Sequence, residues 1–207
     1  MNFELADQLT ELLKKKKLDK AIEIAESKLA KVPKTGFHQI IGKTLTHQTS
    51  ELAEFISNFH TETTKILKKN QGLLKSIFNM NNNLTAEAYY CEMNGFTINC
   101  DLWFIDLFSY EKLGGEDWDW LADFYDSSSN SLTITGFEEL QKVFEGVHEN
   151  NKLEEPNINE SYEICELLVI LRLQELFNAT YKTMDSDWSK IPMFVTAHDY
   201  DMIYRTN

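Results

Sequence analysis

The sequence has little cysteine and no long apolar run, and each shortage excludes a class of protein. The three cysteines, Cys91, Cys100 and Cys165, are odd in number and show no CxxC spacing, so they indicate neither a disulfide framework nor a zinc finger. No stretch approaches the roughly 18 consecutive apolar residues of a membrane span. The first residues also lack a basic region followed by an apolar segment. We therefore expect a cytoplasmic protein with reduced, buried cysteines and no membrane partner.

The motifs of common active sites are missing as well. The eight glycines never form GxGxxG or the GxxxxGK pattern of phosphate-binding loops, so nucleotide binding has no support. The GxSxG elbow of many hydrolases and the HExxH zinc motif do not occur. We expect no cofactor and no metal, and we consider a catalytic function less favoured than a binding function.

The chain is acidic, but its charge is unevenly placed. The net charge is −13; residues 1–80 carry 13 Lys against 9 Asp or Glu, a net +4, whereas residues 81–207 carry 7 Lys or Arg against 24 acids, a net −17. Because attraction to phosphates requires a positive surface, we expect no nucleic-acid partner. The negative charge is first of all typical of a surface that keeps a protein soluble, and the alternative is that it attracts a basic partner.

Composition and periodicity predict one α+β domain over residues 1–207. Hydrophobic residues make up 43% and aromatic residues 12%, which is enough for a substantial core. Apolar residues at helical spacing predict that the N-terminal part, residues 1–80, is helical, with an αα-hairpin followed by a third helix over 37–69. Further helices are expected over 136–148 and 161–184.

The second of these helices has no polar face along Leu167–Leu171, so we expect it to be buried. Arg172 follows this run directly. A guanidinium in such a place is expected to pair with a carboxylate or to reach solvent.

Strand signals occur in the acidic second part, residues 81–207. Asn94-Gly95 lies between two alternating segments and predicts a two-residue type I′ hairpin with Met93 opposite Phe96. A second hairpin is expected between residues 117–125 and 132–135, and a further strand over 192–196. We therefore expect an antiparallel sheet of four or five strands packed against helices, with a helical N-terminal third.

The densest acidic run surrounds two tryptophans directly after Gly114-Gly115. Tryptophans interleaved with acids combine the large apolar area of interface anchors with a negative field that attracts cationic partners. The alternative places either tryptophan in the core with the acids facing water. The candidate partner-binding residues are Glu116, Asp117, Trp118, Asp119, Trp120, Asp123 and Asp126.

Three functions are open at this point. The favoured hypothesis is a non-enzymatic acidic binding protein that neutralises a basic protein partner; in size and charge such a protein is similar to the bacterial immunity proteins that block nuclease toxins. The second is an enzyme with a site near His198, Asp199 and Asp201, which are possible metal ligands but lack a companion cluster. The third is a scaffold or adaptor protein that docks through the N-terminal helical hairpin.

Overall fold

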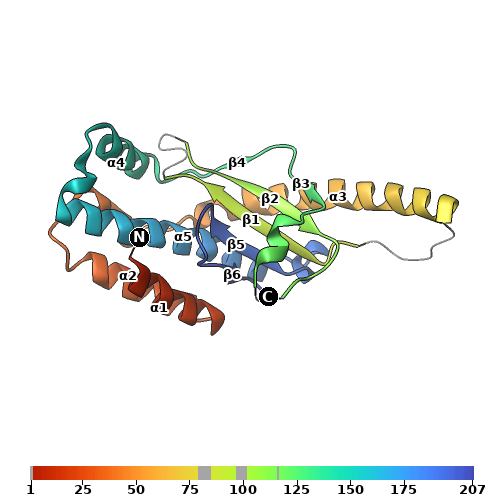
Figure 1. Ribbon diagram of the computed structural model, residues 1–207, viewed down its shortest axis with the longest axis horizontal. Helices are drawn as coiled ribbons and strands as arrows, with labels where there is room; N and C mark the ends of the chain where they lie inside the picture. The colour runs from red at the N-terminus through yellow and green to blue at the C-terminus, as the bar shows by residue number, and fades with distance from the viewer. Residues whose placement is uncertain (1, 79–84, 97–101, 116) are drawn as a thin grey trace.

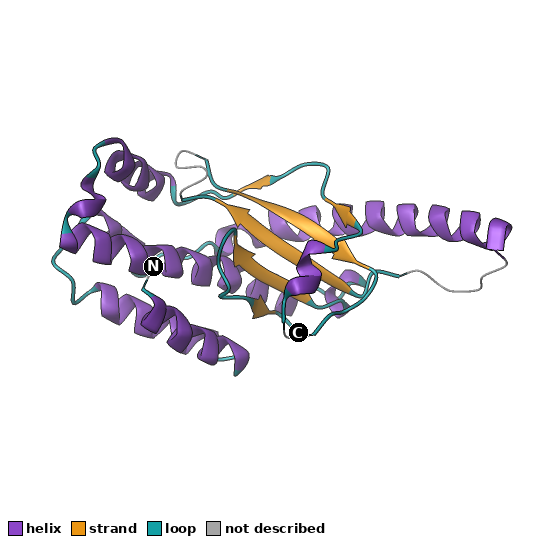
Figure 2. Ribbon diagram, viewed as in Figure 1, coloured by secondary structure: helices purple, strands orange, loops and turns teal. Residues whose placement is uncertain are grey.

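A mixed β-sheet with helices on one face forms the centre of the computed structural model (Figures 1 and 2). The structure describes residues 2–78, 85–96, 102–115 and 117–207. The α-helices within them are α1 (Phe3–Lys14), α2 (Leu18–Leu29), α3 (Thr49–Phe78), α4 (Glu138–Glu149) and α5 (Pro156–Thr183). The strands are β1 (Ala88–Asn94), β2 (Phe104–Tyr110), β3 (Asp126–Ser127), β4 (Leu132–Thr133), β5 (Met193–Ala197) and β6 (Tyr204–Arg205). The predicted α+β class is confirmed.

The N-terminal hairpin forms as predicted. Helices α1 and α2 bury their apolar stripes, which include Leu5, Leu9 and Leu29, and α2 packs along α5. The third helix begins later than predicted. Two short 3₁₀ segments, Gly36–Ile40 and Thr46–Gln48, precede α3, and Gly42 between them has a φ of +73° that ends any helical path. Among the described residues, no helix has both the length and the apolarity needed to cross a bilayer.

The sheet has the order β3-β2-β1-β5-β6, with β4 also paired to β2. Neighbouring strands are antiparallel except β1 and β5, which are parallel with Tyr89 opposite Met193. The prediction of an antiparallel sheet of four or five strands is therefore extended to six strands with one parallel pair. The chain reaches β5 through the long helix α5, as a parallel pairing requires.

The first hairpin pairs β1 with β2, but the predicted register is wrong. Met93 lies opposite Ile105 instead of Phe96, and the positive φ falls on Phe96, at 55°, with none at Gly95. Phe96 and Trp103 are both buried, with ring centroids 5.2 Å apart. Burial of these two rings outweighs the turn preference of Asn-Gly. Residues 97–101, including Cys100, lie outside the described residues.

The second predicted hairpin is also wrong. Residues 117–125 form no strand; they contain a 3₁₀ turn, η3 (Asp119–Ala122). Strands β3 and β4 each pair with β2 and not with one another. By contrast, the helices predicted over 136–148 and 161–184 and the strand predicted over 192–196 are confirmed by α4, α5 and β5.

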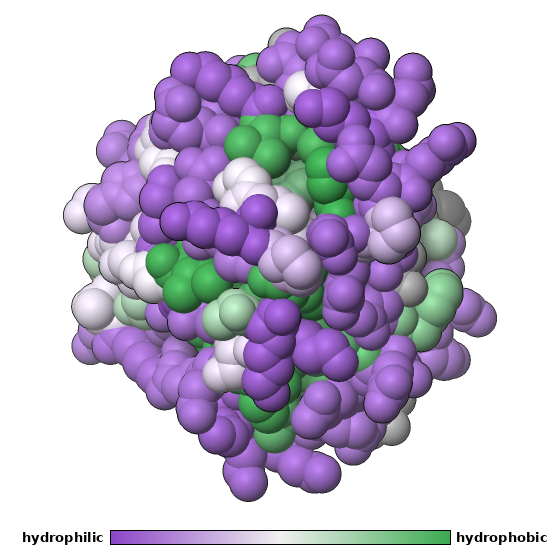
Figure 3. All heavy atoms as spheres, turned by 90° about the vertical axis from the view of Figure 1, so that its left-hand side faces the viewer, coloured by the Kyte–Doolittle hydropathy of each residue, from purple (hydrophilic) through white to green (hydrophobic). Residues whose placement is uncertain are grey.

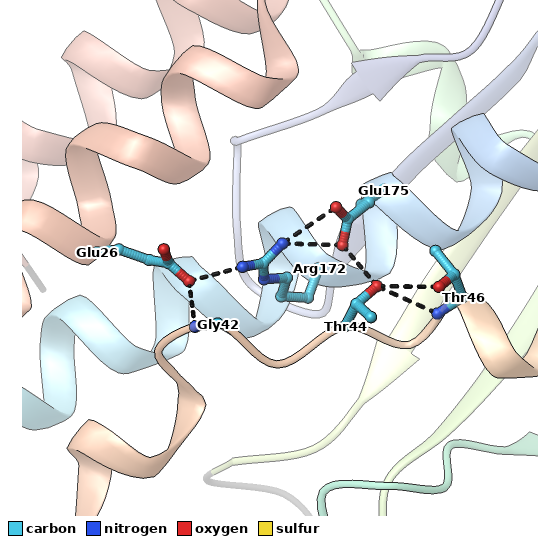
Figure 4. Close-up of polar contacts among 6 residues, drawn as sticks. All are labelled: Glu26, Gly42, Thr44, Thr46, Arg172 and Glu175. Atoms are coloured by element: carbon cyan, nitrogen blue, oxygen red, sulfur yellow. Dashed lines mark hydrogen bonds and ion pairs between the residues drawn. The ribbon is translucent and has the colours of Figure 1, made fainter.

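The inner face of the sheet packs against α3 and α5. Alternate residues of the central strands, such as Tyr89, Leu107 and Val195, point into this core and are fully buried. Helix α5 is buried almost all round. Of the two outcomes expected for Arg172, pairing with a carboxylate is the one observed: its Nη2 lies 2.6 Å from Oε1 of Glu26 and its Nη1 lies 2.9 Å from Oε2 of Glu175 (Figure 4). This ion-pair network ties α2 and the Gly42–Thr46 connection to α5 (Figure 4).

The outer face of the sheet carries a second, smaller apolar cluster. It consists of Ala88, Tyr90, Tyr110 and Phe194, with Phe108, Trp118, Trp120, Leu121 and Ile203 packed against them. The segment between β2 and β3, drawn in green, crosses in front of the sheet in Figure 1, while α3 and α5 lie behind it. This face therefore carries the acidic tryptophan segment singled out from the sequence.

Candidate functional site

Trp120 fixes the acidic segment to the outer face of the sheet. Its ring packs edge-on against Tyr110, at 4.7 Å between centroids, and against Phe194 at 5.4 Å. Its indole N–H donates to the carbonyl oxygen of Gly115 at 3.0 Å. Gly114 permits this packing, because a Cβ there would lie 2.0 Å from Cγ of Trp120. Trp120 is partly exposed and packs on the small outer cluster, so it anchors the acidic segment to the sheet.

Trp118 lies between the sheet and solvent. Its ring packs on Phe194 at 5.5 Å between centroids, and its backbone has a φ of 56°. Its neighbours Asp117 and Asp119 are exposed. In this segment the aromatic rings therefore lie on the sheet and the carboxylates lie in solvent.

The two acidic motifs of the sequence meet in one groove of about 760 Å³, here called the acidic groove. Asp117 and Asp119 come from the segment after β2, and Asp199 and Asp201 come from the turn after β5. Aromatic side chains, including Tyr90 and Trp118, line the space among them, and the described cation at the groove, Lys14, is already paired with Glu11 at 3.0 Å. The result is an open depression with four carboxylates at an aromatic surface.

The other predicted partner-binding residues lie elsewhere. Asp123 lines a separate hollow beside Tyr110 and Trp120. Asp126 accepts a hydrogen bond from Oγ1 of the buried Thr63 at 3.0 Å, and so connects β3 to α3. Glu116 lies outside the described residues.

His198 forms an ion pair next to the acidic groove. Its Nδ1 lies 2.9 Å from Oε1 of Glu92 and its Nε2 lies 3.5 Å from Oδ1 of Asp199. The hydrogen bond to Glu92 raises the pKa of His198, against a smaller effect of partial burial. Tyr90, which lines the groove, donates to the same Glu92 at 3.1 Å. Nothing in the sequence pattern indicated Glu92 as the partner of His198 and Tyr90.

Two cysteines and two histidines elsewhere in the protein are buried or make structural hydrogen bonds. Cys91 and Cys165 are fully buried, and burial raises the pKa of both thiols far above its usual range, which disfavours the reactive thiolate. His60 and His47 bond to hydroxyl groups of Tyr89 and Thr135, at 2.6 and 3.1 Å. Within the described part of the chain, no group of three or more His, Cys, Asp or Glu is arranged to hold a metal ion.

Glu166 is a perturbed group that the sequence reasoning missed. It lies in the apolar run of α5 and is 5% exposed. Burial raises its pKa to about 7, opposed by hydrogen bonds from Tyr200 and Tyr162. A single acid in an otherwise apolar stretch of helix was the signal that could have identified it.

Comparison of this chain with protein-family models, with curated proteins and with solved structures finds no match.

Proposed function

We propose that this protein is a non-enzymatic binding protein whose acidic groove captures a basic segment of a protein partner. The observation that carries the proposal is the convergence of Asp117 and Asp119 with Asp199 and Asp201 around one aromatic-lined depression. Two segments about 80 residues apart in sequence supply these carboxylates. The proposal keeps Asp117, Trp118 and Asp119 from the sequence prediction and replaces Asp123 and Asp126 by the two aspartates after β5.

The groove suits a lysine or arginine side chain physically. Charge-assisted hydrogen bonds from an ammonium or guanidinium to carboxylates are among the stronger polar contacts in proteins. A cation over the face of a tryptophan gains further attraction, and Trp118, which is partly exposed, offers such a ring at this surface. Beyond direct contact, the net −17 of residues 81–207 would steer a basic partner during encounter.

A partner of this kind fits the hypothesis of an immunity-type protein. Nucleases carry positive surfaces because they bind phosphates, so an acidic groove that occupies such a surface would block nucleic-acid binding. In this role the protein needs no catalytic group, cofactor or metal of its own.

The two other hypotheses receive less support. For an enzyme, the Glu92–His198 pair belongs to no group of three or more His, Cys, Asp or Glu among the described residues that could hold a metal ion. The adaptor hypothesis is weakened because the N-terminal hairpin buries its apolar stripe in the core. The end of the molecule at the left of Figure 1 is mainly hydrophilic, with apolar side chains visible only in separate patches (Figure 3). Phe3, 71% exposed, is the large apolar side chain that α1 leaves in solvent.

The test is the association rate with a partner isolated by affinity capture from the native host. The variant D117N/D119N/D199N/D201N removes the four carboxylates of the acidic groove. The matched control E149Q/E154Q/E155Q/E160Q removes four exposed carboxylates near the α4–α5 connection. Both variants change the net charge equally, so a difference between them reports position and not total charge.

We expect the groove variant to associate about tenfold more slowly at low salt, and the control to stay close to the parent protein. The advantage of the parent should shrink as ionic strength rises from about 0.01 M to about 0.15 M, because the Debye length falls from about 30 Å to about 8 Å. An acidic partner, or equal effects of the two variants, would contradict the proposal.

A further inference from the structure

A second groove shares Lys14, Trp118 and Ile203 with the acidic groove, but the rest of its lining is mainly apolar and cationic. It has a volume of about 420 Å³ and is mainly apolar, with Leu113, Trp118, Phe194 and Ile203 among its walls. It forms where the end of α1 meets β6 and the segment after β2 (Figure 1). This volume is within the range of roughly 300–1,000 Å³ that small-molecule sites occupy.

Three cationic side chains border this apolar groove: Lys14, Lys16 and Arg205. Lys14 is paired with Glu11. Neither Lys16 nor Arg205 has an Asp or Glu carboxylate of the described residues within 4 Å, although acids outnumber bases 33 to 20 in the chain.

Main-chain oxygens and aromatic rings hold these two cations in place, and Nε of Arg205 donates to the main-chain oxygen of Asn207. Nζ of Lys16 donates to the main-chain oxygen of Arg205 and lies 5.3 Å from the ring centre of Tyr204. The guanidinium of Arg205 lies 5.8 Å from the ring centre of Phe194, which is a wall of the groove. Partial burial and the nearby Arg205 lower the pKa of Lys16, as expected of an ammonium without an anion beside it.

We propose that this groove binds a small organic carboxylate with an apolar body. The apolar part would lie between Leu113, Trp118 and Phe194, and the carboxylate would accept hydrogen bonds from Lys16 and Arg205 at the rim. A neutral ligand would leave both cations with main-chain oxygens, those of Arg205 and Asn207, as their hydrogen-bond acceptors, and a cationic ligand would be repelled. The inference is independent of the proposed function, because it uses neither the groove aspartates nor a protein partner.

The test is titration calorimetry with two carboxylates and their neutral counterparts. The probes are 1-naphthoate and decanoate, compared with 1-naphthylmethanol and decanol. We expect at least one carboxylate to bind the parent protein at a 1:1 ratio and its alcohol to bind about tenfold more weakly or worse, since hydrogen bonds to charged groups are lost. This comparison requires no variant and so does not depend on how a substitution folds.

The site is then located with a matched pair of variants. K16M/R205M removes the two cations of the groove, whereas K28M/K31M removes two exposed lysines at the end of α2, with the same change in net charge. We expect at least tenfold weaker carboxylate binding in K16M/R205M and unchanged binding in K28M/K31M, with circular dichroism confirming that both fold. Absence of binding by both carboxylates, equal binding of an alcohol, or equal effects of the two variants would overturn the inference. None of these results would affect the acidic groove, whose aspartates remain in every variant.

Discussion

Replacing Arg172 by methionine should destabilise the protein strongly, although the arginine is far from either groove. Its side chain is 8% exposed and contacts two carboxylates, those of Glu26 and Glu175, which are 22% and 25% exposed (Figure 4). Methionine has a similar length and fills most of the space. Its effect would therefore come mainly from the two carboxylates left facing each other without a cation.

The magnitude follows from the surroundings of these carboxylates. Breaking a buried ion pair by removing one partner costs about 3–5 kcal/mol. Here Glu26 keeps the N–H of Gly42 at 2.7 Å and Glu175 keeps the hydroxyl of Thr44 at 2.9 Å, and both are partly exposed. We therefore expect the lower end, about 3 kcal/mol, which corresponds to a fall of roughly 6–12 °C in melting temperature for a chain of this size.

The assay is thermal unfolding of R172M beside the triple variant R172M/E26Q/E175Q. In the triple variant no charge remains in the network, so most of the lost stability should return. R172K should lie between the parent and R172M, because lysine restores the charge without the two-pronged geometry. A fall of less than 2 °C in R172M, or a triple variant no more stable than R172M, would refute the reasoning.

Three further predictions concern single side chains. The pKa of Glu166 is raised from 4.5 to about 7, so its contribution to stability is complete below pH 4.5 and is lost as the pH rises through 7. In denaturant titrations, the free energy of unfolding of E166Q should therefore equal that of the parent at pH 4 and exceed it by up to about 3 kcal/mol at pH 8. G114A should destabilise the protein by about 1–3 kcal/mol, because the added Cβ would overlap Trp120. G146A in α4 should stabilise it by about 0.5–1 kcal/mol, because the added Cβ would have no atom within 4 Å. Equal melting temperatures of the two variants would contradict both predictions. E92Q should lower the pKa of His198 in an NMR titration, because the carboxylate that favours the imidazolium is gone, and an unchanged pKa would show that the pair does not form in solution.

The helices were predictable because their apolar residues repeat at the helical period and no competing signal interferes. Helix α5 is the clearest case, since its run of buried residues leaves a helix no solvent face. Its exception, Arg172, was expected from the cost of burying a charge either to pair with a carboxylate or to reach solvent, and it pairs. Where one local rule decides the structure, the sequence is sufficient.

The strand register was not predictable, because it depends on contacts between distant side chains. Asn94-Gly95 is a strong turn signal by itself, yet Phe96 and Trp103 are buried together against Phe144 of α4. Three aromatic rings in one core outweigh the preference of one dipeptide. The location of Phe144 relative to the strands could not be predicted from the sequence alone.

The acidic groove was likewise predictable only in part, because its two halves are local in sequence but their contact is not. Asp117–Asp119 and Asp199–Asp201 were each recognised as unusual from local composition, but as separate hypotheses for a binding protein and an enzyme. They meet because β5 pairs in parallel with β1, so that the turn after Ala197 emerges at the outer face beside Trp118. A parallel pairing after a long crossover leaves no local sequence signal.

Backbone conformation is unusual at the two proposed grooves. Among the described residues, five other than glycine have a positive φ: Lys16, Phe96, Trp118, Asn151 and Asp199. Three of the five line the grooves: Lys16 in the apolar groove, Asp199 in the acidic groove, and Trp118 in both. A bulky residue such as tryptophan rarely adopts this conformation, and such strain is kept where the surroundings enforce it, most often at binding sites. Trp118 is thus a shared wall held in a costly conformation between a cationic and an anionic surface, so a change that releases its backbone should alter both grooves together.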